Sequence, residues 1–156
     1  MKFTHLKNQK INMVDISKKK STYRTAIAVS NVKFENKSFK RLIENGSPKG
    51  EIFNTARCAG ILGAKKTSEL IPLCHNINLS DVNIDFKVDE KNLIIKIQSE
   101  VSTFASTGVE MEALTSCTIA SLTIYDMCKS IDKKITIETI KLIYKSGGKS
   151  GIFKND

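Results

Sequence analysis

An acid and a base stand three residues apart in a mostly apolar segment, and this spacing is the most informative feature of the chain. Asp126 and Lys129 lie within residues 122–129, whose other members are mainly apolar. Side chains three positions apart share one face of a helix, so the two groups can meet. Charges among apolar residues are costly unless they are paired or used. We therefore interpret the two residues as an acid–base couple rather than as a solvated surface ion pair.

Two further carboxylates, Glu110 and Glu112, interrupt the same apolar pattern upstream. A protein that only grips an anion has no evident use for acids beside it. These acids therefore favour an enzyme over one alternative, a non-enzymatic module that binds nucleic acid or an acidic partner. A second alternative, a different small-molecule lyase or cyclohydrolase, stays open on the residues alone.

The segment Leu73-Cys74-His75 follows a proline break and falls in a loop, where functional residues are common. His75 is one of two histidines, and a lone histidine is more often structural than catalytic. Adjacent side chains diverge, so Cys74 and His75 form neither a metal pair nor a nucleophile–base couple unless a second subunit supplies the partner. The residues alone leave both a structural and a catalytic role for His75 open.

Two lysine–glycine segments could contact an anion. Lys49 and Gly50 stand at the start of a predicted long helix, whose first N–H groups attract anions, although an ordinary first-turn charge is the better interpretation of this segment alone. Lys145 and Lys149 flank Gly147 and Gly148, which allow close backbone approach, but the spacing is not that of a P-loop and no helix follows. Phosphate contact and a flexible C-terminal tail are equally compatible with this second segment.

The charge of the chain narrows its partners. The 156 residues carry a net charge of +9, with 25 basic residues of which only three are Arg, and there is no Trp. A basic protein favours an anionic partner, but nucleic-acid binding usually brings Arg and stacking aromatic residues. We therefore expect a phosphorylated small molecule, no nucleic acid, and a solvated arm at Lys18, Lys19 and Lys20.

Several other classes are disfavoured. No run approaches the ~20 apolar residues of a membrane span, and the N-terminus lacks the apolar region of a signal peptide. The four cysteines form no C-x-x-C pair, which is typical of reduced thiols in the cytosol. Dinucleotide, flavin and iron–sulfur motifs are absent as well. We expect a cytoplasmic protein with no membrane association, no resident metal and no redox cofactor.

The apolar pattern predicts the elements that must position these groups. Period-two alternation predicts strands, and helical spacing predicts helices. The predicted strands cover 22–34, 82–88, 93–101 and 135–145, with a hairpin turn at 89–92; the predicted helices cover 38–44, the segment from Pro48 to Ile71, and 109–131. The order is that of an α+β, ferredoxin-like βαββαβ antiparallel sheet with helices packed on one face. Residues 1–20 are interpreted as an N-terminal arm and residues 21–156 as a single catalytic domain.

Both long helices carry packing signals. Ser47 and Pro48 predict the start of the first one, with Ser47 as N-cap. Gly60 and Gly63 indicate that this helix lies close to another backbone. The helix at 109–131 is apolar over most of its circumference, which predicts packing on the sheet and on a second subunit, and hence a homo-oligomer.

Together these segments resemble one known family. The matching segments are 13–17, 49–50, 55–57, 59–61, 70–75, 107–115, 122–129 and 145–151. The combination of the Leu-Ile-Pro-Leu-Cys-His and Thr-Gly-Val-Glu-Met-Glu-Ala-Leu runs with Ile-Tyr-Asp-Met-Cys-Lys is highly specific. The chain resembles the cyclic pyranopterin monophosphate synthases, the C proteins of molybdenum cofactor biosynthesis.

The resemblance implies a phosphorus–oxygen lyase. Its substrate would be 3′,8-cyclo-7,8-dihydro-GTP, which is converted to cyclic pyranopterin monophosphate with release of pyrophosphate. The resemblance also implies hexamers built as trimers of dimers, with the site at a dimer interface. No cofactor is expected to be required, and Mg²⁺ could accompany the pyrophosphate, held by phosphate oxygens.

The resemblance assigns roles by position. The residues that match catalytic positions are Lys49, Asp126 and Lys129, and those that match substrate-binding positions are Leu73, Cys74, His75, Met111 and Glu112, with Glu110, Lys145 and Lys149 as further pocket positions. These types fit the chemistry, since rearranging a purine-derived ring needs proton transfers and expelling pyrophosphate needs cations near the developing charge.

Overall fold

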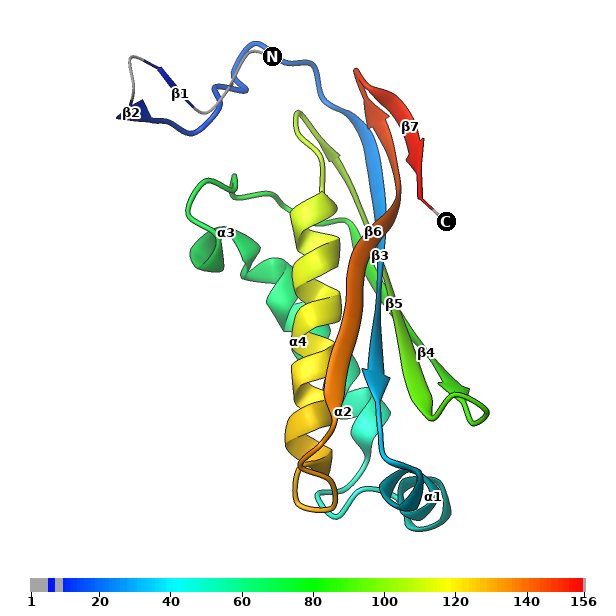
Figure 1. Cartoon of the computed structure of the whole chain (residues 1–156). Helices are drawn as coiled ribbons and strands as arrows, with labels where there is room; N and C mark the ends of the chain where they lie inside the picture. The colour runs from blue at the N-terminus through cyan, green and yellow to red at the C-terminus, as the bar shows by residue number, and fades with distance from the viewer. Residues whose placement is uncertain (1–5, 8–9, 156) are drawn as a thin grey trace.

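One antiparallel sheet forms a layer of the molecule, and two long helices cover one of its faces (Figure 1). The computed structural model describes residues 6–7 and 10–155. The sheet has the order β4-β5-β3-β6-β7, with β4 at Asp81–Asp89, β5 at Ile94–Ala105, β3 at Thr22–Lys33, β6 at Thr136–Gly148 and β7 at Gly151–Lys154. The helices are α1 (Asn36–Asn45), α2 (Ile52–Lys65), α3 (Thr67–Leu70) and α4 (Glu110–Cys128), and a small pair of strands, β1 (Leu6–Lys7) and β2 (Lys10–Ile11), lies outside the sheet.

The predicted α+β, ferredoxin-like order is confirmed, because β3 pairs antiparallel with both β5 and β6, and β4 pairs with β5. The turn predicted at 89–92 is also confirmed, since the backbone N–H of Asn92 donates to the Asp89 side chain between β4 and β5. The division into an arm at 1–20 and a domain at 21–156 stays a prediction. Residues 1–5, 8–9 and 156 of these segments lie outside the described residues.

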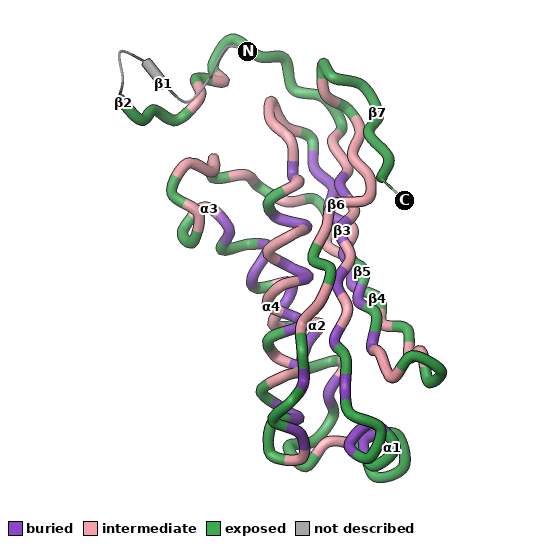
Figure 2. Tube along the Cα trace, in the orientation of Figure 1, coloured by how far each residue is buried: buried purple, intermediate pink, exposed green. Residues whose placement is uncertain are grey.

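The core lies between the sheet and the helices (Figure 2). Alternate residues of β3 and β5 point toward the helices, as the pleat of a strand requires. Side chains that the core buries almost completely include Ala26, Ala28, Val32, Ile95, Ile97 and Val101 on the strands and Ala113, Cys117, Ala120 and Ile124 on α4. The small residues on β3 let α4 lie close to the centre of the sheet.

Glycines on α2 allow it to pack closely against its neighbours, as the sequence predicted. A Cβ at Gly60 would lie 3.0 Å from the Ser116 carbonyl oxygen of α4, and one at Gly63 would lie 2.8 Å from Ile119. Both distances are shorter than ordinary van der Waals contact, so larger residues would push the two helices apart. The close contact fixes α4 beside α2 on the same face of the sheet.

The predicted start of α2 is wrong. The helix begins at Ile52, and its N-cap is Glu51, whose carboxylate accepts hydrogen bonds from the N–H groups of Phe53 and Asn54. Ser47 and Pro48 belong to the preceding turn, because the positive φ of Gly50 (103°) turns the chain before the helix can begin. An acidic side chain therefore occupies the helix N-terminus that was considered for an anion.

The C-terminal boundary also differs from the prediction. Strand β6 continues past Lys145 to Gly148, and β7 folds back to pair with it. The glycines end the apolar alternation without ending the strand, since Lys145 and Ser146 still pair with β3. Residues 151–154 thus form an edge strand rather than a flexible tail.

Among the described residues, no helix is long and apolar enough to cross a bilayer.

Candidate active site

Helix α4 carries predicted site residues at both ends. Glu110 opens the helix and Asp126 lies in its last turn, sixteen positions later. At 1.5 Å per residue the two positions are about 24 Å apart. One protomer therefore holds two separate groups of site residues, and each is described in turn.

The lysine–aspartate cluster, formed by Lys49, Asp126 and Lys129, lies at the C-terminal end of α4. Lys129 Nζ lies 2.7 Å from Asp126 Oδ1, and Lys49 Nζ lies 2.7 Å from Oδ2 of the same carboxylate. The contact between Asp126 and Lys129 that their spacing predicted is therefore confirmed. Lys129 and Lys49 lower the pKa of Asp126 to about 2, and the carboxylate in turn raises the pKa of Lys129. The carboxylate stays ionised across the physiological range, between two cations.

The expected burial of this cluster is wrong for the single chain. The Asp126 side chain is 53% exposed and that of Lys129 is 52% exposed, because both lie on the face of the last turn that points away from the core. The apolar neighbours that suggested burial, such as Ile124 and Met127, point into the core instead. The cluster is open to a ligand or to another subunit.

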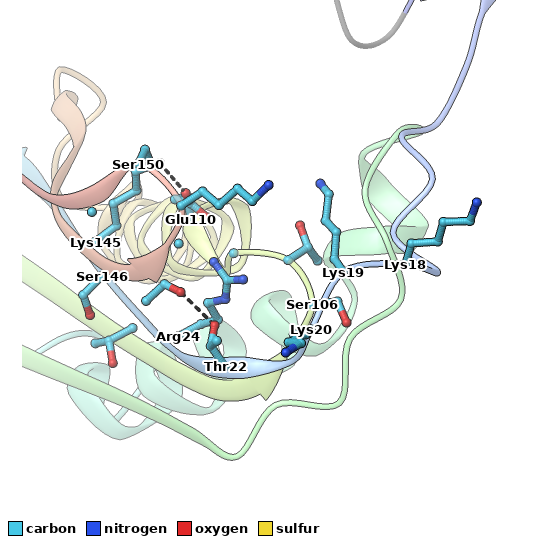
Figure 3. A pocket seen from close by; sticks show the side chains of 17 residues that line it. Lys18, Lys19, Lys20, Thr22, Arg24, Ser106, Glu110, Lys145, Ser146 and Ser150 are labelled. Atoms are coloured by element: carbon cyan, nitrogen blue, oxygen red, sulfur yellow. Dashed lines mark hydrogen bonds and ion pairs between the residues drawn. The ribbon is translucent and has the colours of Figure 1, made fainter.

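The basic pocket lies near the N-terminal end of α4 and has a volume of about 470 Å³ (Figure 3). Of the described side chains that line it, six are basic and one, Glu110, is acidic. The lining residues are Lys18, Lys19, Lys20, Thr22, Arg24, Thr25, Ser106, Thr107, Gly108, Glu110, Lys145, Ser146, Gly147, Gly148, Lys149, Ser150 and Gly151. Glu110 Oε1 lies 3.0 Å from Lys145 Nζ. This concentration of cations and backbone groups suits a polyphosphate.

Strand geometry explains why these residues gather. Thr22 and Arg24 point to the same side of β3, and the neighbouring strand β6 brings Gly147 beside them. The Thr22 hydroxyl donates to the Gly147 carbonyl at 2.7 Å. Gly147 has a φ of 89°, and a Cβ there would overlap the Tyr23 carbonyl oxygen, so only glycine fits. The glycine segment closes the pocket by packing directly on the β3 backbone.

The carboxyl pocket adjoins the basic pocket and has a volume of about 350 Å³. The two share Lys19, Thr107, Gly108 and Glu110; the carboxyl pocket adds Val14, Ile16, Leu73, Cys74, His75, Ile77, Met111 and Glu112. His75 Nε2 lies 2.7 Å from the Val14 carbonyl oxygen. A carbonyl only accepts, so Nε2 carries the hydrogen, and in the neutral ring Nδ1 is the acceptor. The bond also holds the N-terminal segment over the pocket.

Glu112 is the group with the most perturbed proton affinity in this pocket. Only 4% of the residue is exposed, and burial raises its pKa to about 7, assisted by the nearby Glu110 charge. Burial and the Glu112 charge likewise raise the pKa of Cys74, which argues against a thiolate nucleophile. A carboxyl group that titrates near neutral pH can both give and take a proton.

The predicted residues thus separate into two sets. Leu73, Cys74, His75, Glu110, Met111 and Glu112 line the carboxyl pocket, Lys145 and Lys149 line the basic pocket, and Lys49, Asp126 and Lys129 form the distant cluster. A single chain does not bring the two sets together. The catalytic and binding roles assigned to these residues remain predictions.

The sequence reasoning missed several lining residues. Lys18, Lys19 and Lys20 were interpreted as a solvated arm, yet they line the basic pocket together with Arg24. A signal was present, because Lys20, Thr22 and Arg24 alternate with the period of a strand and therefore point the same way.

Within residues 6–7 and 10–155, no group of three or more His, Cys, Asp and Glu side chains could hold a metal ion.

Comparisons with known proteins identify the family of the chain. The model of the MoaC family matches residues 13–148. A relative from Bordetella parapertussis is 51% identical over 146 residues, covering 94% of this chain and 91% of the relative. Relatives from Bacillus subtilis (46% identical; 99% of this chain, 92% of the relative) and Syntrophomonas wolfei (47% identical; 100% of both) are similar to it as well. All three are named cyclic pyranopterin monophosphate synthase. The chain therefore belongs to the MoaC family.

Proposed function

We propose that the chain is a cyclic pyranopterin monophosphate synthase, a lyase of molybdenum cofactor biosynthesis. It converts 3′,8-cyclo-7,8-dihydro-GTP to cyclic pyranopterin monophosphate and releases pyrophosphate. The observation that carries this proposal is the junction of the basic pocket with the carboxyl pocket at Glu110. A nucleotide-derived triphosphate has the same two parts, a polyanionic tail and a ring system with exchangeable protons.

The basic pocket takes the triphosphate in this proposal. Arg24, Lys145 and Lys149 supply cations, and the close-packed glycines supply backbone groups. The ring system occupies the carboxyl pocket, where Glu112 and Nδ1 of His75 can exchange protons with it. Mg²⁺ would reach the site on the phosphates, and we expect no resident cofactor to be required.

The catalytic cluster must come from a second protomer. A general acid or base acts within hydrogen-bond reach of the proton that it moves, whereas Asp126 lies about 24 Å from Glu110 along its own helix. In a twofold dimer the C-terminal end of one α4 can lie beside the N-terminal end of the other, which completes two sites at once. Met111 and Leu122, exposed on α4 to 38% and 49%, are apolar enough for such an interface.

Within the completed site the lysine–aspartate cluster has two tasks. Lys49 and Lys129 stabilise the negative charge that develops as the α-phosphate is attacked and pyrophosphate leaves. Asp126 stays ionised and holds both ammonium groups in place until the substrate arrives. We further propose a cytoplasmic hexamer built from three such dimers.

The direct test is to incubate the purified protein with the cyclised GTP intermediate and to measure pyrophosphate release. We expect turnover in the wild type and a rate about 10²–10⁴-fold lower in Asp126→Asn, with GTP itself as a negative control substrate. Absence of product from the folded wild-type protein would exclude this activity.

Mixing two inactive variants tests the shared site. Asp126→Asn damages one set of residues and Glu112→Gln the other, so a hybrid dimer contains one intact site if protomers share it. After random exchange of subunits we expect about a quarter of wild-type activity, since half of the dimers are hybrids and half of their sites are intact. Mixtures that stay as inactive as the parents after verified exchange would place the whole site within one protomer.

A further inference from the structure

The loop that carries Lys49 is held in one conformation by its own backbone. Gly46 has a φ of 72° and donates its N–H to the Leu42 carbonyl at 2.9 Å, which ends α1. The N–H of Gly50 donates to the Ser47 carbonyl at 3.1 Å, and Gly50 has a φ of 103°. Residues 46–50 therefore form a tight turn between α1 and α2, with Lys49 inside it.

Ser47 joins this turn to the end of α4. Its hydroxyl donates to the Met127 carbonyl at 2.9 Å and accepts the backbone N–H of Lys49 at 3.2 Å. Met127 belongs to the last turn of α4, where carbonyls lack a partner within the helix. One side chain thus contacts the residue next to Asp126 and the backbone of Lys49.

We infer that Ser47 is a positioning residue that aligns Lys49 with the Asp126 carboxylate. This inference rests on the proposed function, because it concerns the lysine–aspartate cluster. Both ends of the Lys49–Asp126 contact are anchored through the hydroxyl, one at the Lys49 amide and one at the last turn of α4.

The ion pair alone is a weak means of holding this geometry. The Lys49 and Asp126 side chains are 43% and 53% exposed, and exposed ion pairs contribute little because water screens them. The lysine side chain also has many rotamers, so the position of its ammonium group depends on how firmly its backbone is held. A half-buried hydroxyl that bonds to two backbone groups restricts the backbone itself.

Kinetics of four variants test the inference. Removing the hydroxyl in Ser47→Ala should lower kcat about 10-fold with little change in KM. A displacement of the Lys49 ammonium group by about 1 Å slows the reaction more than it weakens substrate binding. Ser47→Thr keeps the hydroxyl and should retain most of kcat, and the exposed Ser130→Ala should match the wild type. In a Lys49→Ala background, Ser47→Ala should have no further effect on kcat. An unchanged kcat in Ser47→Ala, or a full 10-fold loss in the Lys49→Ala background, would overturn the inference.

A second measurement does not depend on the reaction. NMR titration of the Asp126 carboxyl should give a pKa near 2 in the wild type and in Ser130→Ala, and a higher pKa in Ser47→Ala, where Lys49 no longer stays at its side. If the wild type has no synthase activity but the pKa rises in Ser47→Ala, the proposed function fails and the positioning role stands. If the pKa does not move, Ser47 does not position Lys49.

Discussion

The two ends of α4 hold carboxylates in opposite environments. Glu112, in the first turn, is 4% exposed, and burial raises its pKa to about 7. Asp126, in the last turn, has a side chain that is 53% exposed, and two lysines lower its pKa to about 2. The same functional group is therefore prepared to exchange a proton at one end and to remain a fixed charge at the other.

This contrast shows which effect dominates at each end. The helix dipole favours a negative charge in the first turn and disfavours one in the last, typically by 0.3–1 kcal/mol. Both pKa shifts run against the dipole. Burial at Glu112 and direct lysine contacts at Asp126 are thus stronger than the position on the helix, and neighbours from other elements decide the role of each acid.

The largest expected effect on turnover comes from variants that remove the ion pairs at the C-terminal end of α4. Asp126→Asn removes the fixed charge, and Lys129→Ala removes one of its cations. We expect each to lower kcat by about 10²–10⁴-fold while the fold and assembly persist, because the cluster is half exposed and supports little of the core. Pyrophosphate-release kinetics with light scattering as a folding control would check this. Near-normal turnover in either variant would remove that residue from the catalytic set.

A second pair of variants separates the two ends kinetically. Lys49 belongs to the lysine–aspartate cluster and Lys149 to the basic pocket. Lys49→Ala should mainly lower kcat, by about 10–100-fold, whereas Lys149→Ala should mainly raise KM, since it removes binding shared by the ground and transition states. An unchanged KM in Lys149→Ala would exclude this lysine from substrate binding.

The third variant tests burial at the N-terminal end through stability. The pKa of Glu112 rises from 4.5 in the unfolded chain to about 7 in the folded protein, so the folded state binds more protons between these two values. The free energy of unfolding therefore falls as pH increases through this window. The loss reaches about 3 kcal/mol above pH 7. Glu112→Gln should therefore be more stable than the wild type at pH 8 and equally stable at pH 4. Denaturant unfolding at both pH values measures this, with the exposed Glu69→Gln as control. An equal gain at pH 4 would point to packing rather than to ionisation.

The smallest effect sharpens the link between the two pockets. A Cβ at Gly108 would overlap the Glu110 carboxylate, so Gly108→Ala should push that side chain away from Lys145. Lys145 would then be free for an anion, and we expect pyrophosphate to bind about 2–10-fold more tightly by calorimetry, as it should in Glu110→Gln. Weaker binding in both variants would mean that Glu110 orients Lys145 instead of competing for it.

The periodic elements of the fold were predictable from the sequence, whereas the glycine-rich boundaries were not. Alternation at 82–88 and 93–101 gave β4 and β5, and the apolar pattern gave α4. The end of β6 was missed because Gly147 and Gly148 look like a turn, although the hydrogen bond from Thr22 to Gly147 and the pairing of Gly148 with Gly151 keep them in the sheet. Ser47 looked like an N-cap because the positive φ of Gly50 cannot be read from the sequence alone.

The sequence analysis named site residues at both ends of α4 but did not separate them into two sets. The sixteen positions between Glu110 and Asp126 already fixed a separation along a helix, so the two sets could have been distinguished from the sequence. The pKa shifts of the site residues could not be predicted from the sequence, because they depend on Lys49, on the 73–75 loop and on burial by segments distant in the chain. The exposure of Asp126 was missed because its apolar neighbours face the opposite side of the helix.

The length of α4 restricts how sequences of this kind can diverge. One inserted or deleted residue would shift Asp126 by 1.5 Å along the axis and rotate it by about 100° relative to Glu110. Because both ends serve a site in the proposed dimer, no compensating movement of a single loop could restore the geometry. Insertions should be tolerated at the 89–92 turn, which is mostly exposed and belongs to neither pocket nor to the cluster. The helix itself should vary in composition but not in residue count.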